Sequence, residues 1–294
     1  MKKLIPALLV LVAVSACDSG DSPEEVDRYF QVQLRLDGLS ALDGGAAYEA
    51  WALINQNWTS IARFNYDLEG RIVDTGGRLI ANTFITDFDM AGAAEILVTV
   101  EDRRDADLIP SATRVLHGDV VGSGAALTFE SAVADLSAVQ ASYTIGTPTD
   151  SDPNNEAFGV WLGTPGTYQQ AMTAPVLSPG WGYELWIQLA EPVSLGKFSD
   201  PGSRDESARF SSTPELFGVP GEDLLHTAPQ GQTFPLAVAG HRIFVTLEPN
   251  PDDFEATPYG IRVLEADIPA GAQPGTALQM SVVNQVPSGT AQFR

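Results

Sequence analysis

The chain has 294 residues, of which 44% are hydrophobic and 18% are charged, so it is long enough for one large or two modest domains and is not a disordered polyelectrolyte. Its formal net charge of −22 at pH 7 disfavours nucleic acid and anionic lipid surfaces as partners, because like charges repel. The single cysteine, Cys17, excludes a disulfide within the chain, so stability must come from the hydrophobic core.

The first 16 residues have the pattern of a secretory signal peptide. Two lysines precede an apolar run over residues 4–14, which is shorter than the roughly 20 residues that a membrane-spanning helix needs. The ending "VSAC" (14–17) resembles a bacterial lipobox, in which cleavage exposes a cysteine that carries lipid. We therefore expect lipid attachment at Cys17 and anchoring on the extracytoplasmic side of a bacterial membrane. The alternative is an ordinary cleavage site followed by an incidental cysteine.

A polar segment, "CDSGDSPEEVD" (17–27), follows the signal peptide and is expected to form a flexible tether between the lipid and the folded body. Removal of residues 1–16 takes away two lysines, which leaves 14 basic and 38 acidic residues and a net charge of −24 (14 − 38). The mature protein is therefore even more acidic than its precursor.

From residue 28 onward, short segments of alternating hydrophobicity predict β-strands. In "RYFQVQLRLDGL" (28–39), Phe30, Val32 and Leu34 alternate with polar residues, which is the period of a half-buried strand. Further strands are predicted over 95–101, 113–121, 126–133, 157–163, 242–248, 260–268 and 277–286. One short helical turn is expected at 203–210. The 20 prolines and 27 glycines disfavour long helices, so the sequence predicts an all-β fold.

Two halves of the chain share a set of short sequence words in the same order. The paired words are "YEAW" (48–51) and "YELW" (183–186), "SIARF" (60–64) and "SLGKF" (194–198), and "VTVE" (98–101) and "VTLE" (245–248). Each half then continues with a proline, three further residues and Arg-Val-Leu. The second half also carries a longer insertion at 200–234. This recurrence predicts a tandem duplication, with antiparallel β-sandwich modules at 28–140 and 141–294.

Each repeated unit begins with a predicted β-hairpin. Centring the first turn on Gln56 places Glu49 opposite Arg63, and Trp51 opposite Ile61. The second copy gives the same set of pairs, which are Glu184 with Lys197 and Trp186 with Leu195. A glutamate beside a tryptophan is also typical of a catalytic acid, but a directly opposed cation favours a structural ion pair that contributes about 0.2–1 kcal/mol.

These residues resemble a known family. The order "YEAWALI", "SIARF", "VTVE" and "RVL", with its second copy, is similar to the C-terminal extracytoplasmic domain of anti-sigma-K factors. The resemblance covers most of 30–121 and 180–265; "TLEP" (246–249) fits the family pattern, whereas "TVED" (99–102) departs from it at Asp102. It implies a β-sandwich module of the cell envelope. The sequence shows neither the cytoplasmic sigma-binding domain nor the membrane span of that family, so sigma binding is not carried over.

Catalytic and metal-binding patterns are weak in this sequence. The best metal candidate is a Ca²⁺ loop within "TDSDPNNE" (149–156), whose oxygen donors would be Asp150, Asp152, Asn155 and Glu156. It lacks the glycine and the spacing of an EF-hand. None of the three histidines stands at metal-ligand spacing to another histidine, and no cofactor is expected. Trp58, near a hairpin tip, and Trp181, between two glycines, are candidates for a recognition surface or for structural packing.

We therefore expect a non-enzymatic, lipid-anchored protein of the cell envelope that serves as a binding or sensing scaffold. Its partners would be the membrane, through lipidated Cys17, and an envelope protein or a glycan. Two alternatives remain open. One is an envelope hydrolase that uses paired carboxylates about 5–10 Å apart in a deep cleft, and the other is a Ca²⁺-binding adhesive module.

Overall fold

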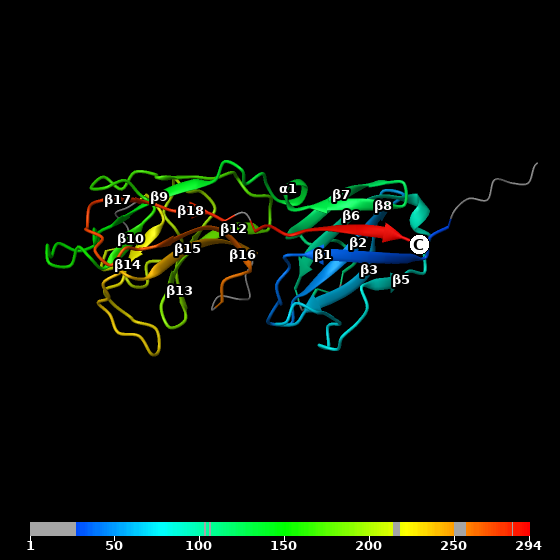
Figure 1. Cartoon of the computed structure of the whole chain (residues 1–294), viewed down its shortest axis with the longest axis horizontal. Coiled ribbons are helices and arrows are strands. Elements are labelled where there is room, and N and C mark those ends of the chain that lie inside the picture. The colour runs from blue at the N-terminus through cyan, green and yellow to red at the C-terminus, as the bar shows by residue number, and fades with distance from the viewer. Residues whose placement is uncertain (1–27, 103, 106, 214–217, 250–256, 284) are drawn as a thin grey trace, which may run out of the picture.

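The computed structural model confirms an all-β fold of curled antiparallel sheets. It describes residues 28–102, 104–105, 107–213, 218–249, 257–283 and 285–294. The described strands form two lobes that lie side by side along the long axis of the molecule (Figure 1). Cys17 and the tether lie outside the described residues.

The first lobe is built on one nine-stranded sheet, in which all neighbouring strands are antiparallel. In spatial order its strands are β4 (Ile72–Val73), β3 (Asn57–Tyr66), β2 (Ala47–Ile54), β6 (Ala93–Glu101), β7 (Arg114–Val121), β8 (Gly124–Thr128), β19 (Ser288–Phe293), β1 (Gln31–Asp37) and β5 (Thr83–Ile85). The sheet curls so that β3 and β5 approach each other. The 5.9 Å between the rings of Phe64 and Phe84 shows this approach. The inner faces of this curl enclose the core of the lobe.

The last strand, β19, belongs to the first lobe although it ends the chain. It lies between β8 and β1, with Leu34 opposite Ala291 and Thr290 opposite Ala126. The division predicted at residue 140 is therefore wrong for this segment, because the backbone groups of 288–293 are paired with strands from the first 130 residues. Sequence landmarks did not include these residues, so nothing in the repeat indicated their partner.

The second lobe consists of two five-stranded sheets. One has the order β11 (Met172–Thr173), β9 (Gln140–Ile145), β10 (Gly159–Trp161) and β14 (Gly221–Asp223), with β17 (Ala277–Gln279) also paired to β9. The other has the order β13 (Pro192–Phe198), β12 (Trp181–Gln188), β15 (Arg242–Pro249), β16 (Ile261–Asp267) and β18 (Ser281–Val282). The order β13-β12-β15-β16 matches the order β3-β2-β6-β7 of the first lobe, so the repeated words occupy equivalent strands.

The predicted strand periods agree with the observed faces where one side of the sheet is buried. In β1, Val32 and Leu34 are buried, whereas Gln31 and Arg35 are exposed. Two predicted segments are broken. Residues 126–133 form the end of β8 and then helix α1 (Phe129–Ala132), because the Thr128 hydroxyl accepts a hydrogen bond from the Ser131 amide as a helix cap.

The segment predicted as one strand over 277–286 divides at Met280. Residues before this buried methionine join β9, and residues after it join β16, so the segment passes from one sheet of the second lobe to the other. The expected helical turn at 203–210 is wrong, because these residues have no helical conformation. Besides α1, the described residues contain the 3₁₀ turn η1 (Met90–Gly92).

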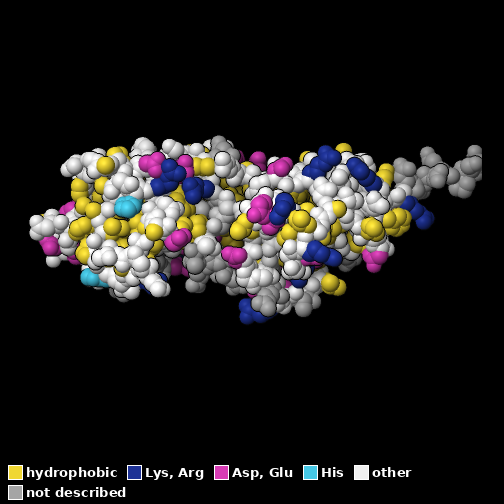
Figure 2. Space-filling view, turned by 60° about the horizontal axis from the view of Figure 1, so that its bottom comes forward, with side chains coloured by type: hydrophobic (Ala, Val, Ile, Leu, Met, Phe, Trp, Pro, Cys, Tyr) yellow, Lys and Arg dark blue, Asp and Glu magenta, His cyan; other side chains and the backbone are white. Residues whose placement is uncertain are grey.

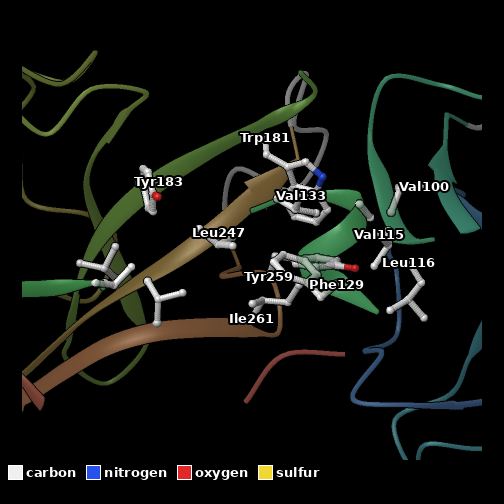
Figure 3. Packing of buried hydrophobic residues seen from close by; sticks show 14 of the residues in the cluster. Val100, Val115, Leu116, Phe129, Val133, Trp181, Tyr183, Leu247, Tyr259 and Ile261 are labelled. Atoms are coloured by element: carbon white, nitrogen blue, oxygen red, sulfur yellow. The ribbon is translucent and has the colours of Figure 1, made fainter. Parts of the chain in front are cut away.

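The two lobes share a continuous hydrophobic core. Figure 3 shows Phe129 of the first lobe beside Trp181 and Tyr259 of the second, with Val115 and Leu116 close by. Figure 2 shows small groups of apolar side chains scattered among charged and polar ones on one face of the molecule. The lobes are therefore joined through buried apolar contacts and not only by the connecting chain.

Candidate functional site

The two ion pairs predicted in the repeated hairpins are present. Glu49 lies opposite Arg63 in the β2–β3 ladder and forms an ion pair with its guanidinium group. Glu184 lies opposite Lys197 in the β12–β13 ladder, with 3.9 Å between Lys197 Nζ and Glu184 Oε2. Arg63 also reaches Asp105, at 3.2 Å, so the first pair is extended by a second carboxylate. Both glutamates are buried, which fits a structural role.

The predicted partner of Trp51 is wrong by one position. Trp51 lies opposite Ser60 and not opposite Ile61, because the turn has two central residues, Asn55 and Gln56, and is not centred on Gln56. The register reaches the predicted one only beyond the shift between Ala50 and Trp51. Ile61 is the extra residue of this β-bulge. The shift places the Ser60 hydroxyl beside Glu49, to which it donates a hydrogen bond.

The same bulge occurs in the second hairpin. Trp186 lies opposite Ser194 and not opposite the predicted Leu195, and the Ser194 hydroxyl donates a hydrogen bond to Glu184. A symmetric count from the turn cannot detect a bulge, because the count assumes one residue against one residue along the whole hairpin. Serine at the same place in "SIARF" and "SLGKF" was the available signal.

A buried polar chain crosses one face of each repeated sheet. In the first lobe, Trp51 Nε1 donates to Thr99 Oγ1 at 2.9 Å, and the Thr99 hydroxyl donates to Glu101. Glu101 also accepts from the Ser111 amide at 3.0 Å. Burial raises the pKa of Glu101 to about 7. These groups satisfy one another's hydrogen bonds, which is what buried polar groups require.

The second lobe repeats this chain. Trp186 Nε1 donates to Thr246 Oγ1 at 2.8 Å, Thr246 donates to Glu248, and Glu248 accepts from the Tyr259 amide at 2.9 Å. The threonine and the glutamate are the second and fourth letters of "VTVE" and "VTLE". The repeated words therefore encode the same buried hydrogen-bond network in both lobes.

A second group of buried acids lies in the insertion of the second lobe. Asp205 accepts from the amides of Ser207, at 2.9 Å, and Gly221, at 2.7 Å. Glu222 accepts from the Ser207 hydroxyl at 2.9 Å and from the Phe210 amide. Burial raises the pKa of Asp205 to about 8 and that of Glu222 to about 7, and the negative charge of Glu222 adds to the shift of the Asp205 pKa.

Asp223 extends this group on the opposite face of β14. It accepts from Trp161 Nε1 at 2.8 Å and from the Thr149 amide at 2.9 Å, and burial raises its pKa to about 6. The cavity beside Asp205 has a volume of about 10 Å³, which is the size of one water molecule. Paired carboxylates with raised pKa values are therefore present, but the space beside them is too small for a sugar ring.

The predicted Ca²⁺ loop uses its oxygen atoms internally. Asp150 accepts from the Asp152 amide at 2.9 Å and from the Asn155 side chain at 2.8 Å. Glu156 accepts from the Thr147 amide at 3.4 Å. Among the residues that the structure describes, the acids of this loop do not form a group of three converging ligand atoms. These hydrogen bonds are typical of turns, in which aspartates accept from nearby amides.

Trp181 is a structural residue at the junction of the lobes. It is the first residue of β12 and is 5% exposed. Its Nε1 donates to the Arg114 carbonyl at 2.7 Å, and its ring lies 6.0 Å from Phe129 and 5.6 Å from Tyr259 (Figure 3). Trp58 is half-buried within β3. Packing therefore explains Trp181, whereas Trp58 stays a candidate for recognition or for packing.

A polar concavity on the outer face of β1 and β19 is the candidate ligand site. Its volume is about 220 Å³, and it is lined by Gln33, Arg35, Thr290, Gln292 and Arg294. Gln33 lies opposite Gln292, and Arg35 lies opposite Thr290. Arg294 Nη2 donates to Gln33 Oε1 at 2.8 Å. Two guanidinium groups above neutral hydrogen-bonding side chains can bind an anionic ligand.

The concavity was missed because its two halves are more than 250 positions apart in the sequence. Only the pairing of β1 with β19 brings them together. The available signal was the alternation of polar residues in "QVQLR" (31–35) and "TAQFR" (290–294), both of which place a glutamine and an arginine on one face.

Comparisons of the chain with protein-family models, with curated proteins and with solved structures found no match. Within the described part of the chain, no helix is both long and apolar enough to cross a membrane. The function of the protein is accordingly inferred from the sequence patterns and from the geometry of the repeated network, the buried acids and the arginine concavity.

Proposed function

We propose that the protein is a non-enzymatic, lipid-anchored scaffold of the bacterial cell envelope, made of two units similar to the extracytoplasmic domain of anti-sigma-K factors. The observation that carries this proposal is the repeated strand order, with the same Trp-Thr-Glu chain and the same hairpin ion pair in each lobe. The repetition preserves packing and hydrogen bonding, which is typical of a scaffold. The lipobox pattern at Cys17 supports the anchor.

The concavity at Arg35 and Arg294 is proposed as the ligand-binding surface of this scaffold. The chain as a whole is strongly acidic and repels anions, so a ligand with one acidic group and several hydroxyl groups would be attracted to a surface that carries arginines, as this one does. The glutamines and the threonine on the concavity floor would accept and donate hydrogen bonds to the hydroxyl groups. An acidic glycan of the envelope has this chemistry.

The anchor is tested by labelling cells that express the full chain with a palmitate analogue. The wild-type protein is expected to carry the label and to sediment with membranes, and Cys17→Ser is expected to lose both properties. An unlabelled wild-type protein would contradict the anchoring.

The ligand surface is tested by calorimetry of the purified protein with glucuronate, and with glucose as the neutral comparison. Glucuronate is expected to bind, and Arg35→Gln is expected to weaken binding at least tenfold. Arg78→Gln is the matched control, because Arg78 is an exposed arginine that pairs with Asp74 and does not line the concavity. Equal binding by wild type and Arg35→Gln would remove the concavity from the proposal.

A second candidate, a hydrolase that acts through paired carboxylates, draws on the raised pKa values of Asp205 and Glu222. It requires the insertion to open, because the present cavity holds about one water molecule. The test is hydrolysis of a panel of glycosides by wild type and by Glu222→Gln. Turnover that the variant abolishes while it remains folded would favour the enzyme over the scaffold.

A further inference from the structure

A mixed group of nitrogen and oxygen ligands lies on the outer face of the first lobe. Glu95 on β6 lies directly opposite Asp119 on β7. His117 is two positions before Asp119 and therefore shares its face of the sheet. His117 Nε2 is 3.0 Å from Glu95 Oε2, and one ligand atom from each of the three residues lies within 4.8 Å of the others.

The second lobe provides an internal comparison for this group. The words "VTVE" and "VTLE" begin 147 positions apart (245 − 98), and at the same offset Glu95 corresponds to Arg242 (242 − 95). The two "RVL" words begin 148 positions apart (262 − 114), and at that offset Asp119 corresponds to Asp267 (267 − 119). Arg242 and Asp267 are also directly opposed, and they form a two-point ion pair with distances of 2.7 and 3.1 Å. Opposite charges thus occupy this position in the second lobe.

The first lobe has two carboxylates at the same position. Directly opposed like charges destabilise a sheet, whereas the opposed pair in the second lobe stabilises it. The residue that corresponds to Glu265 is His117 (265 − 117 = 148), so the first lobe also replaces a carboxylate by an imidazole. The net result is a set of one imidazole and two carboxylates around one point, in which Glu95 and His117 are half-buried and Asp119 is exposed.

We propose that Glu95, His117 and Asp119 bind one divalent transition-metal ion of the Zn²⁺ type. A cation removes the repulsion between the opposed carboxylates, and the imidazole selects a metal that accepts nitrogen ligands over Ca²⁺ or Mg²⁺. Three protein ligands leave a coordination position open to water or to a group from a partner. The ion would also join β6 to β7 at the place where Arg242 joins Asp267 in the other lobe.

The test is titration of the purified protein with ZnCl₂ at pH 7, followed by calorimetry and by the melting temperature. Wild type is expected to bind one equivalent and to melt at a higher temperature with Zn²⁺. Glu95→Arg and His117→Glu, which install the residues of the second lobe, are expected to weaken binding at least tenfold. Glu95→Arg is also expected to raise the melting temperature in the absence of metal, because it restores the ion pair with Asp119.

His226→Gln is the control for incidental binding by a histidine, since His226 is exposed and lies in the other lobe. It is expected to bind Zn²⁺ like the wild type. CaCl₂ is the control for binding by carboxylates alone and is expected to give no heat at this site. Absence of Zn²⁺ binding, or binding that survives in folded Glu95→Arg or His117→Glu, would overturn the proposal.

Discussion

Tyr48 and Tyr259 share a buried hydrogen bond, with 2.8 Å between their hydroxyl oxygens, although they are 211 positions apart in the chain. The Tyr48 hydroxyl also donates to the Ser40 carbonyl at 2.9 Å, so Tyr259 is the donor in the bond between the tyrosines. Burial raises the pKa of both phenols, which remain protonated. The bond ties β2 of the first lobe to the segment that leads into β16 of the second.

Removing the two hydroxyl groups should therefore have unequal effects. Tyr48→Phe leaves the Ser40 carbonyl and the Tyr259 hydroxyl without their partner, and it should lower the free energy of unfolding by about 1–3 kcal/mol. Tyr259→Phe leaves Tyr48 bonded to Ser40 and should cost only about 0.5–1.5 kcal/mol. Denaturant unfolding measures both values. Equal losses would contradict the assigned donor direction.

Trp181 should control whether the lobes unfold together. Trp181→Ala removes the ring that packs between Phe129 and Tyr259, and it should cost about 3–5 kcal/mol. Because these contacts cross the junction, the variant should melt in two calorimetric transitions where the wild type melts in one. Trp58→Ala, in the first hairpin, is the control and should lower stability without dividing the transition. A single transition in Trp181→Ala would show that other contacts couple the lobes.

The two hairpin ion pairs should differ in strength. Arg63→Met leaves buried Glu49 without its guanidinium partner and should cost about 1–3 kcal/mol, a value reduced from that of a fully buried pair because Arg63 is one-third exposed. Lys197→Met should cost less, since Lys197 Nζ stands 3.9 Å from Glu184. The double variant Glu49→Gln with Arg63→Met should recover part of the loss. Urea unfolding of the wild type, the two single variants and the double variant tests this order of stabilities. A larger loss in Lys197→Met than in Arg63→Met would contradict it.

The buried acids predict that stability falls as the pH rises from about 4 to 8. The pKa values of Asp205, Glu222 and Asp223, at about 8, 7 and 6, lie above their unfolded values, so the native state binds more protons in this window. Each group contributes a slope of up to about 1.4 kcal/mol per pH unit while it titrates. Unfolding free energies measured at several pH values report this slope.

Asp205→Asn should flatten the dependence between pH 6 and 8. Asp135→Asn is the control, because hydrogen bonds from Ser137 lower the pKa of the exposed Asp135 carboxyl, and its contribution is lost only as the pH falls below about 4. A wild-type protein that gains stability up to pH 8 would contradict the assigned shifts.

Local pattern was sufficient to predict the strands and the hairpin ion pairs. Alternation in β1 identified its buried face. Glu49 was placed opposite Arg63 by centring the turn on Gln56. The turn in fact has two central residues, Asn55 and Gln56, both with positive φ, and the bulge at Ile61 shifts the register so that Glu49 still faces Arg63. The bulge at Ile61 escaped prediction because the pairing was counted from the turn at one residue against one. In β3 the bulge breaks the alternation, since the buried residues Ile61 and Phe64 are three positions apart. Local rules therefore give the strand but not its exact register along the hairpin.

The sites made by distant segments could not be predicted in the same way. Asp223 is held by Thr149 and Trp161, and the Arg35 concavity needs β19. Such sites depend on which strands become neighbours, and a single sequence does not state this. The opposed Glu95 and Asp119 belong to the same class, because the register of β6 and β7 is set by the sheet as a whole.

The placement of β19 has a consequence for biosynthesis. Translation delivers residues 288–293 only after the whole second lobe has been made, yet β8 and β1 have no ladder between them until these residues arrive. Until then, both strands present free edges that can pair with other nascent chains. The first half of the molecule must therefore wait for residues 288–293 before it completes its own sheet, so a premature stop codon ahead of residue 288 would damage the lobe that was synthesised first.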